Sequence, residues 1–273
     1  DSRLRSVIGR RGPDDFSTRL GVLREWPGRL SFDLIQCIPG QDAGSAVADV
    51  EAALNSAPVD HLSVYSLSVD PDTPLARRLR MTEPSSEVAA DIAQATTAAL
   101  ESYDFHQYEV SNFSRPGFES AHNLGYWFGR PYLGIGPGAV STLPAEDGRP
   151  QRLAMPASIE RYLCSKRSAA EVENLTPENL LLERFMLGLR TRFGVAVDRL
   201  SVELGIDGGF LDDPRVARRV SSGELRFRRG RLTAYPVGVL CLDAILADLA
   251  CALDNLHPYF ATPWRAWFPC PHF

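Results

Sequence analysis

The stretch Leu30–Ile38, LSFDLIQCI, is a short and mostly apolar run that ends at a Pro-Gly pair. A second run, His61–Val69 (HLSVYSLSV), ends at an Asp-Pro pair. Runs of this length that close on turn residues predict buried strands. Helical patterns over 43–55 and 87–103 follow the two runs in turn. Strands that alternate with helices of this length indicate parallel β-α units, so the predicted fold class is α/β.

Two shorter strands are predicted further along, at 107–111 (QYEVS) and 132–135. The polar, turn-rich residues 146–150 predict a linker. Beyond them, Thr176-Pro177 has the residue types of a helix N-cap and first helical position. Helices are also predicted at 197–204, 214–220 and 236–253, with a hairpin over 223–234 that turns at Arg229-Gly230.

Helices followed by a small hairpin are typical of a winged helix. We therefore expect an α/β domain over residues 1–143 and a small winged-helix-like α+β domain over 151–254. Residues 255–273 are rich in aromatic residues and proline without a period, so we predict an irregular tail.

Composition narrows the class of protein. The chain of 273 residues is 44% hydrophobic and carries a formal net charge of −5, which excludes a disordered or collagen-like chain. The negative charge argues against a nucleic-acid partner. The 5 cysteines form no C-x-x-C pair, so their spacing predicts neither a zinc nor an iron–sulfur site, and free thiols are typical of the cytoplasm. Two aspartates interrupt the longest apolar stretch, so no membrane span is predicted.

The densest chemical window is Ala121–Gly129, AHNLGYWFG. A neutral imidazole such as that of His122 is a common ligand of metals and of heme iron, and aromatic rings are natural walls for a flat macrocycle. The alternative is a core helix whose histidine is hydrogen-bonded. Nearby, YLGIGPGAVS (132–141) lacks the spacing of a dinucleotide or P-loop motif, and its glycines equally suit a structural turn.

Several segments together resemble, in order and spacing, the HemW family of heme chaperones, which is similar to oxygen-independent coproporphyrinogen III oxidases and belongs to the radical S-adenosylmethionine (SAM) class. These segments are IGR (8–10), SFDLIQCIPGQD, DHLSVYSLSVDPDTPLARR, QYEVSNFSRPG, HNLGYW, YLGIGPGAVS and GLRTRFGV.

The resemblance implies a partial (β/α)6 radical SAM barrel with a [4Fe–4S] cluster, followed by the winged-helix-like domain. LSFDLIQCI would be the fifth barrel strand and HLSVYSLSV the sixth. The chain begins at Asp1, so we expect the earlier strands, with the C-x-x-x-C-x-x-C cluster loop, to lie upstream. The sequence would then be the C-terminal portion of the protein.

The resemblance also assigns residues to SAM. Arg10 matches the arginine that holds the SAM carboxylate, and Asp33 matches an aspartate that contacts SAM on the fifth strand. Ser68 and Val140 fall where small side chains or backbone line the SAM pocket. Cys37 departs from the pattern, because the family usually has glycine there.

His122, Asn123 and Tyr126 match the H-N-x-x-Y pattern that the family uses for heme. His122 would hold the heme iron, with Asn123 or Tyr126 orienting it.

The expected function is therefore a heme chaperone that hands heme to a hemoprotein of the respiratory chain, with a transient membrane-associated partner and no nucleic acid. Two alternatives stay open. One is the related enzyme coproporphyrinogen III dehydrogenase of porphyrin biosynthesis, and the other is an inactive truncated fragment.

Overall fold

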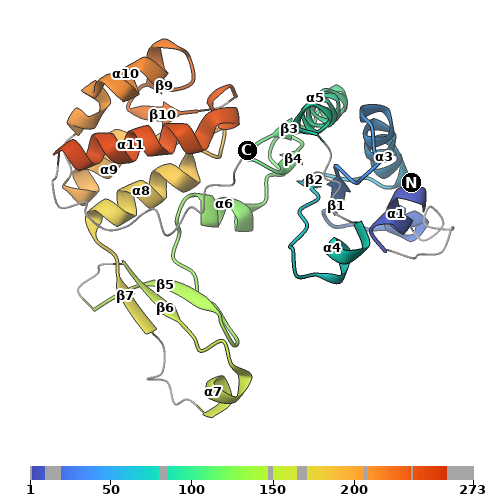
Figure 1. Cartoon of the computed structure of the whole chain (residues 1–273), viewed down its shortest axis with the longest axis horizontal. Helices are drawn as coiled ribbons and strands as arrows, with labels where there is room; N and C mark the ends of the chain where they lie inside the picture. The colour runs from blue at the N-terminus through green and yellow to red at the C-terminus, as the bar shows by residue number, and fades with distance from the viewer. Residues whose placement is uncertain are drawn as a thin grey trace. The chain divides into compact units, whose positions relative to one another are not determined.

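The computed structural model describes residues 2–9, 20–79, 85–146, 150–164, 171–205, 208–234 and 236–256. The chain forms two compact units, Asp1–Ala121 and His122–Phe273 (Figure 1). The assignment of domains to 1–143, 151–254 and 255–273 stays a prediction, and the tail from 257 lies outside the described residues.

The first unit contains a four-stranded sheet of order β1-β2-β4-β3. β1 (Ser31–Gln36) and β2 (His61–Ser66) are parallel, with Ser31 opposite His61, as the β-α-β pattern predicts. β4 (Asn112–Ser114) runs antiparallel to β2 and pairs with the short β3 (His106–Gln107).

The position predicted for a strand, 107–111, was wrong. Residues 108–111 instead form the hairpin connection between β3 and β4, where the Tyr108 N–H donates to the Asn112 carbonyl at 3.0 Å. The carboxylate of Glu109 accepts from the Ser111 N–H inside this connection. The alternation of apolar and polar residues suits a strand, but these local bonds turn the chain instead.

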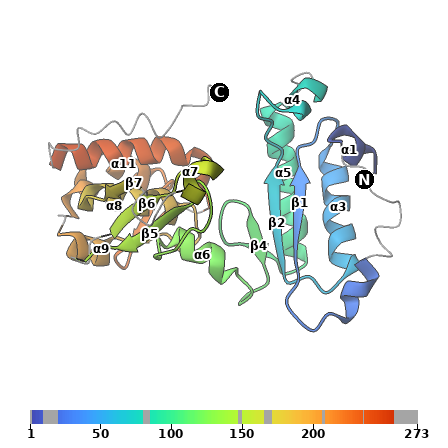
Figure 2. The ribbon, with the colours of Figure 1, turned by 90° about the horizontal axis from the view of Figure 1, so that it is seen from below.

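Two long helices cover one face of this sheet (Figure 2). α3 (Ala43–Ser56) begins with a capping box between Asp42 and Ser45, and α5 (Ser86–Ser102) is capped by the Ser85 hydroxyl. Their apolar stripes pack with the sheet residues Leu62, Val64 and Phe113 to form the core of the unit. The shorter helices are α1 (Ser2–Val7), η1 (Val22–Glu25) and α4 (Pro74–Leu79).

The second unit begins with α6 (Ala121–Trp127) and an antiparallel sheet of order β5-β6-β7. These strands are β5 (Val140–Pro144), β6 (Pro150–Ala154) and β7 (Glu171–Asn174), with α7 (Ile159–Cys164) after β6.

Two predictions for this region were wrong. Pro150 pairs with Pro144 in the antiparallel ladder of β5 and β6, so the end of the linker predicted over 146–150 belongs to a strand, and residues 147–149 lie outside the described residues. The strand predicted over 132–135 is reduced to a single bridge between Tyr132 and Thr142, because glycines at 134, 136 and 138 turn the chain back onto β5.

The rest of the second unit has the predicted order of helices and hairpin. α8 (Pro177–Gly188) begins where Thr176 accepts from the Asn179 N–H at 3.2 Å. The remaining elements are β8 (Val195–Ala196), α9 (Val197–Leu204), η2 (Gly208–Asp212), α10 (Pro214–Ser221), β9 (Arg226–Arg228), β10 (Arg231–Thr233), η3 (Gly238–Cys241) and α11 (Leu242–Leu256).

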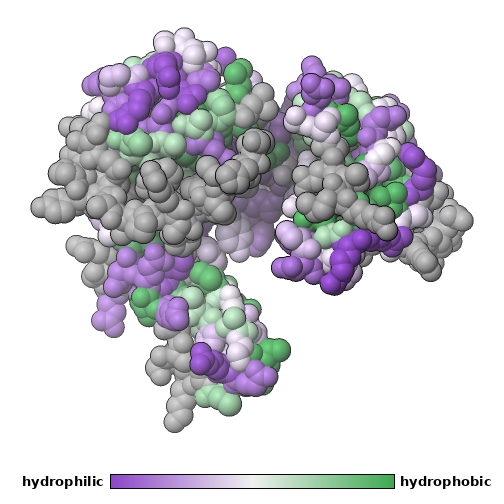
Figure 3. Space-filling model, in the orientation of Figure 1, coloured by the Kyte–Doolittle hydropathy of each residue, from purple (hydrophilic) through white to green (hydrophobic). Residues whose placement is uncertain are grey.

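The hairpin turns at Arg229 and Gly230, which both have positive φ, as a tight β-turn between twisted strands requires. The core beneath it joins α8, η2 and α11 through Phe185, Phe210 and Leu249, all fully buried. Figure 3 shows that hydrophilic side chains gather over α10 and the hairpin.

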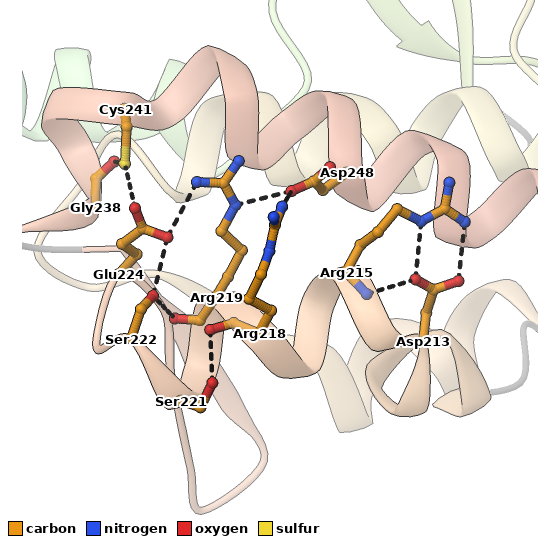
Figure 4. A network of polar contacts seen from close by, with 10 residues as sticks. All are labelled: Asp213, Arg215, Arg218, Arg219, Ser221, Ser222, Glu224, Gly238, Cys241 and Asp248. Carbon is orange, nitrogen blue, oxygen red and sulfur yellow. Dashed lines mark hydrogen bonds and ion pairs between the residues drawn. The ribbon is translucent and has the colours of Figure 1, made fainter.

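Ion pairs between Arg218 or Arg219 of α10 and Asp248 of α11 link the two helices (Figure 4). Nε of Arg219 lies 2.8 Å from Asp248 of α11, and Nη1 lies 3.0 Å from Glu224. Asp213 caps the N-terminus of α10 by accepting from the Arg215 N–H, and its carboxylate accepts two more hydrogen bonds from the Arg215 guanidinium. None of the described helices combines the length and apolar character that crossing a bilayer requires.

Candidate functional site

The predicted heme motif lies on α6, and the side of the helix that carries His122 and Tyr126 is exposed. His122 and Tyr126 are one helical turn apart, and their rings meet edge to face with centroids 5.1 Å apart. Both side chains are exposed, Tyr126 by 42%, and α6 has no buried residue. The aromatic residues of α6 are therefore not part of a buried core, as the alternative predicted, and the imidazole of His122 is exposed.

Tyr132 extends this aromatic face, although no site role was predicted for it. Its ring lies 4.9 Å from that of Tyr126, and its backbone is fixed by the paired bonds to Thr142. Leu133 and Ile135 follow it with exposed fractions of 66% and 86%. Exposed large apolar side chains beside aromatic rings are typical of a binding surface for a flat apolar molecule.

The end of α6 is a Schellman motif. Gly129 has φ +60°, its N–H donates to Tyr126, and the Arg130 N–H donates to the Gly125 carbonyl at 2.8 Å. Nη1 of Arg184, on α8, donates to the Phe128 carbonyl at 3.0 Å. This contact brings the guanidinium of Arg184 to the C-terminal end of the helix that carries His122.

The residues assigned to SAM are distributed over both units. Asp33 lies on β1 with an exposed side chain, and Ser68 is exposed in the segment after β2. Val140 begins β5 in the second unit, where its backbone packs against Gly134. Arg10 lies outside the described residues. The SAM assignment of these four residues stays a prediction.

The register places Asp33 in a row of polar residues that the sequence did not reveal. Asp33 pairs with Ser63 of β2, which pairs with Asn112 of β4. Ser63 and Asn112 are each only 5% exposed, and Oδ1 of Asn112 is buried without a hydrogen-bond donor. Buried polar atoms normally have a partner, so this oxygen marks a position that suits a ligand with a donor group.

Glu109 holds Asn112 in place. Its carboxylate, 1% exposed, accepts from the Asn112 side-chain amide and from the Ser111 N–H. Burial raises the pKa of Glu109, and the hydrogen bonds oppose that shift. The sequence shows Glu109 and Asn112 only as polar residues near a strand end. Their pairing depends on the β3–β4 turn.

A second polar row lies next to the first. Nδ1 of His61 lies 2.8 Å from the Ser31 hydroxyl, and Nε2 lies 2.8 Å from the Tyr108 hydroxyl. His61 is 8% exposed, and burial lowers its pKa although the Asp33 carboxylate acts in the opposite direction. Because both of its ring nitrogens form hydrogen bonds, His61 has a structural role in this sheet: it links the Ser31 and Tyr108 side chains.

Comparison with known proteins finds relatives in sequence. No family model matches the chain. The chain is 34% identical over 224 residues to the heme chaperone HemW of Mycobacterium tuberculosis, covering 81% of this chain and 55% of that protein. It is 35% identical over 179 residues to the mitochondrial radical S-adenosyl methionine domain-containing protein 1 of Danio rerio, covering 62% and 40%. The chain thus spans about half the length of these relatives.

A solved structure supports the fold. The coproporphyrinogen III oxidase HemN of Escherichia coli, a radical SAM enzyme, matches with a TM-score of 0.74 at 18% identity, covering 91% of this chain and 61% of that one. The predicted fold class, the last part of a radical SAM barrel followed by a winged-helix-like α+β domain, is therefore confirmed. The chain is therefore a homologue, at 32–35% identity, of proteins named heme chaperone HemW and radical S-adenosyl methionine domain-containing protein 1.

Proposed function

We propose that this chain binds heme as cargo on the open face of α6 and passes it to a hemoprotein. The observation that carries the proposal is the exposed imidazole of His122, packed edge-on against the exposed ring of Tyr126. A helix that buries none of its aromatic residues gains little folding stability from them. Such residues are more readily explained by binding.

Each residue of the face has a distinct part in this proposal. A ring nitrogen of His122 binds the iron, and the Tyr126 ring limits the orientations of the imidazole. Asn123, on the same helix, orients the ligand from the second shell of contacts. The rings of Tyr126 and Tyr132 form an apolar wall, and the exposed Leu133 extends the apolar surface. Because the face is open, heme can leave without unfolding of the helix.

We further propose that SAM contacts this chain through Arg10, Asp33, Ser68 and Val140. The unpaired Oδ1 of Asn112, in one row with Asp33, suits a ligand that carries amino or hydroxyl donors. In radical SAM proteins the bound [4Fe–4S] cluster supplies an electron to SAM. This sequence contains no C-x-x-x-C-x-x-C motif, so its own residues do not fit the cluster, and no step is assigned to it.

The recipient in this proposal is a hemoprotein of the respiratory chain, met in the cytoplasm or through a transient membrane-associated partner. The HemW relatives are named heme chaperones, which supports this direction of transfer.

A hemin titration tests the proposal. We expect a shifted Soret band on binding, and at least about a tenfold weaker affinity in His122→Ala, because the iron loses its axial ligand. The matched control is His106→Ala, since His106 is a partly exposed histidine in the first unit that contacts Asp104. If His122→Ala and His106→Ala bind hemin alike, with the spectrum of the unchanged protein, then His122 is not the ligand.

A further inference from the structure

Two edge strands of the second unit carry opposite charges in the same alternation. β9 is the outer strand of the sheet β8-β10-β9, and β7 is the outer strand of the sheet β5-β6-β7. The sequence of β9 is Arg-Phe-Arg (226–228), and that of β7 begins Glu-Val-Glu (171–173). All of these residues are exposed, Phe227 by 42% and Val172 by 56%. Each strand thus has charged side chains on one face and an apolar side chain on the other.

The apolar residue of each strand is also the one whose backbone groups face the open edge. Successive residues of an antiparallel strand direct their N–H and C=O groups to opposite sides. Arg228 flanks the two-residue turn and bonds to β10, so the backbone groups of Phe227 face away from β10. In β7 the Leu175 N–H donates to the Pro150 carbonyl at 3.3 Å. Every second residue before Leu175 also faces β6, which leaves the backbone groups of Val172 at the open edge.

The charges nearest the ends of these edges are best placed for a partner. Within the part of the chain that the structure describes, no ion pair reaches Arg228 or Glu171. Arg228 lies opposite Arg231 of β10, and like charges in cross-strand positions repel each other. A carboxylate beside Arg228 would offset that repulsion. Glu173 is 46% exposed and lies 3.5 Å from Arg152, so it is partly neutralised within the chain.

Only the pairing of β9 with β7 brings unlike charges together. Two β9 edges would place arginine against arginine, and two β7 edges would place glutamate against glutamate, which disfavours both pairings. Figure 1 shows α8 between β7 and β9 in the second unit, so one chain does not pair its own two edges. The complementary edge is therefore found on a second copy of the same chain.

We propose that β9 of one copy of this chain adds to β7 of another copy as an antiparallel pair. The outward backbone groups set the register, in which Phe227 and Val172 exchange two backbone hydrogen bonds. Arg228 then lies opposite Glu171, and the other arginine of β9 lies opposite the other glutamate of β7. Each chain carries one edge of each kind, so the contact is head-to-tail. Three cross-strand pairs form a small interface, and the association is weak and reversible.

The simpler explanation is that the charges only protect the two edges from pairing, as charged side chains on edge strands commonly do. That explanation predicts a monomer at low and at high salt, with no relation between Arg228 and Glu171. The proposal instead predicts that these two positions depend on each other. Exchanging their charges between two variants should restore the association that each variant alone has lost.

The experiment is analytical ultracentrifugation of the full chain over a series of concentrations. At low salt we expect the mean mass to rise with concentration, and at high salt to rise less, because salt screens exposed charge pairs. Arg228→Glu and Glu171→Arg should each weaken the association about tenfold, since each converts an opposite-charge pair into a like-charge pair. An equal mixture of the two variants should associate nearly as strongly as the unchanged chain. Arg77→Glu, at an exposed arginine of α4, makes the same charge change as a matched control.

Loss of folding does not obscure the result. Arg228→Glu replaces a like-charge pair with Arg231 by an opposite-charge pair, so the hairpin is not weakened, and circular dichroism checks both variants. A chain that stays monomeric at every concentration overturns the proposal. Association that both variants retain also overturns it, since another surface then carries the contact. A mixture that associates no better than its components shows that Arg228 and Glu171 do not face each other, and equally overturns it.

Discussion

The guanidinium of Arg184 occupies the space in which a side chain on Gly129 would begin. Gly129 also has φ +60°, in the left-handed region. We therefore expect Gly129→Ala to destabilise the second unit by about 1–3 kcal/mol, through backbone strain and displacement of the guanidinium. Thermal or urea unfolding measures this change.

Gly205→Ala is the matched control for that experiment. Gly205 has φ +66° at the end of α9, but nothing lies within 4 Å of its Cβ position, so only the strain of about 1 kcal/mol applies. We expect Gly129→Ala to be the more damaging change, and a second substitution, Arg184→Ala, to recover part of the loss. Equal effects of the two glycine substitutions would show that Arg184 moves aside freely.

A second prediction concerns Cys37, a non-glycine residue at φ +59°. Its side chain is 3% exposed and packs near Ala46 and Ile92. Cys37→Ala loses the buried sulfur and keeps the backbone strain, whereas Cys37→Gly relieves about 1 kcal/mol of strain. We expect the glycine variant to be at least as stable as the alanine variant in urea unfolding.

Ala46→Gly provides the comparison for Cys37. Ala46 lies inside α3, where glycine costs about 1 kcal/mol relative to alanine. The order of stability of Gly and Ala should therefore differ between positions 37 and 46. A clear preference for alanine at both positions would mean that the positive φ of Cys37 carries no cost.

The third prediction concerns the ion pairs between α10 and α11. The side chain of Arg219 is 15% exposed and binds both Asp248 and Glu224, while Arg218 is 67% exposed and reaches only Asp248 among the described residues. We expect Arg219→Gln to destabilise the second unit by about 1–2 kcal/mol, because two partly buried carboxylates lose a donor. Arg218→Gln should stay within about 0.5 kcal/mol.

High salt provides a check on that difference. Salt screens an exposed ion pair more than a buried one, so the small effect of Arg218→Gln should vanish and the effect of Arg219→Gln should persist. If both substitutions cost the same at low and high salt, then Arg219 does not fasten the two helices.

A fourth prediction is a pH dependence from His61. Burial lowers the pKa of His61 from its ordinary value of 6.5. Above pH 6.5 the imidazole is neutral in both the folded and the unfolded chain. As the pH falls below 6.5, the unfolded chain binds a proton first, so the free energy of unfolding of the first unit decreases until the pH passes the folded pKa.

The measurement compares unfolding at about pH 7.5 and pH 5.5 in the unchanged chain and in His61→Gln. Glu109 acts with the opposite sign, because burial raises its pKa and its protonation favours the folded chain as the pH falls. Glu109 is present in both proteins, so the difference between their pH slopes belongs to His61. Identical slopes would contradict the prediction.

Much of the fold could be predicted where local signals agree with packing. The Asp42–Ser45 capping box and the Thr176-Pro177 start mark two helices in sequence, and the structure places α3 and α8 there. The sheet of β5, β6 and β7 could not be predicted in this way. Its central strand, PQRLA, and one outer strand, EVEN, consist mostly of polar residues, and cross-strand pairing rather than apolar alternation stabilises them.

The candidate site also contains residues whose placement could be predicted from the sequence and residues whose placement could not. His122 and Tyr126 are one helical turn apart in sequence, so their shared face follows from helix geometry alone. The row of Asp33, Ser63 and Asn112 depends on the register of three strands, one of them antiparallel. Nothing local in the sequence fixes that register, so Ser63 was missed and Asn112 was not placed.

β1 has one strand neighbour among the described residues, since it stands at the end of the order β1-β2-β4-β3. Its six residues, Ser31–Gln36, form a straight parallel ladder with β2 on the other side. A six-residue edge with no proline can accept an added strand along its full length. A synthetic extended peptide that matched this edge would add a strand to the sheet next to β1. Such a peptide would allow labels or tethers to be attached at a site far from α6 in sequence.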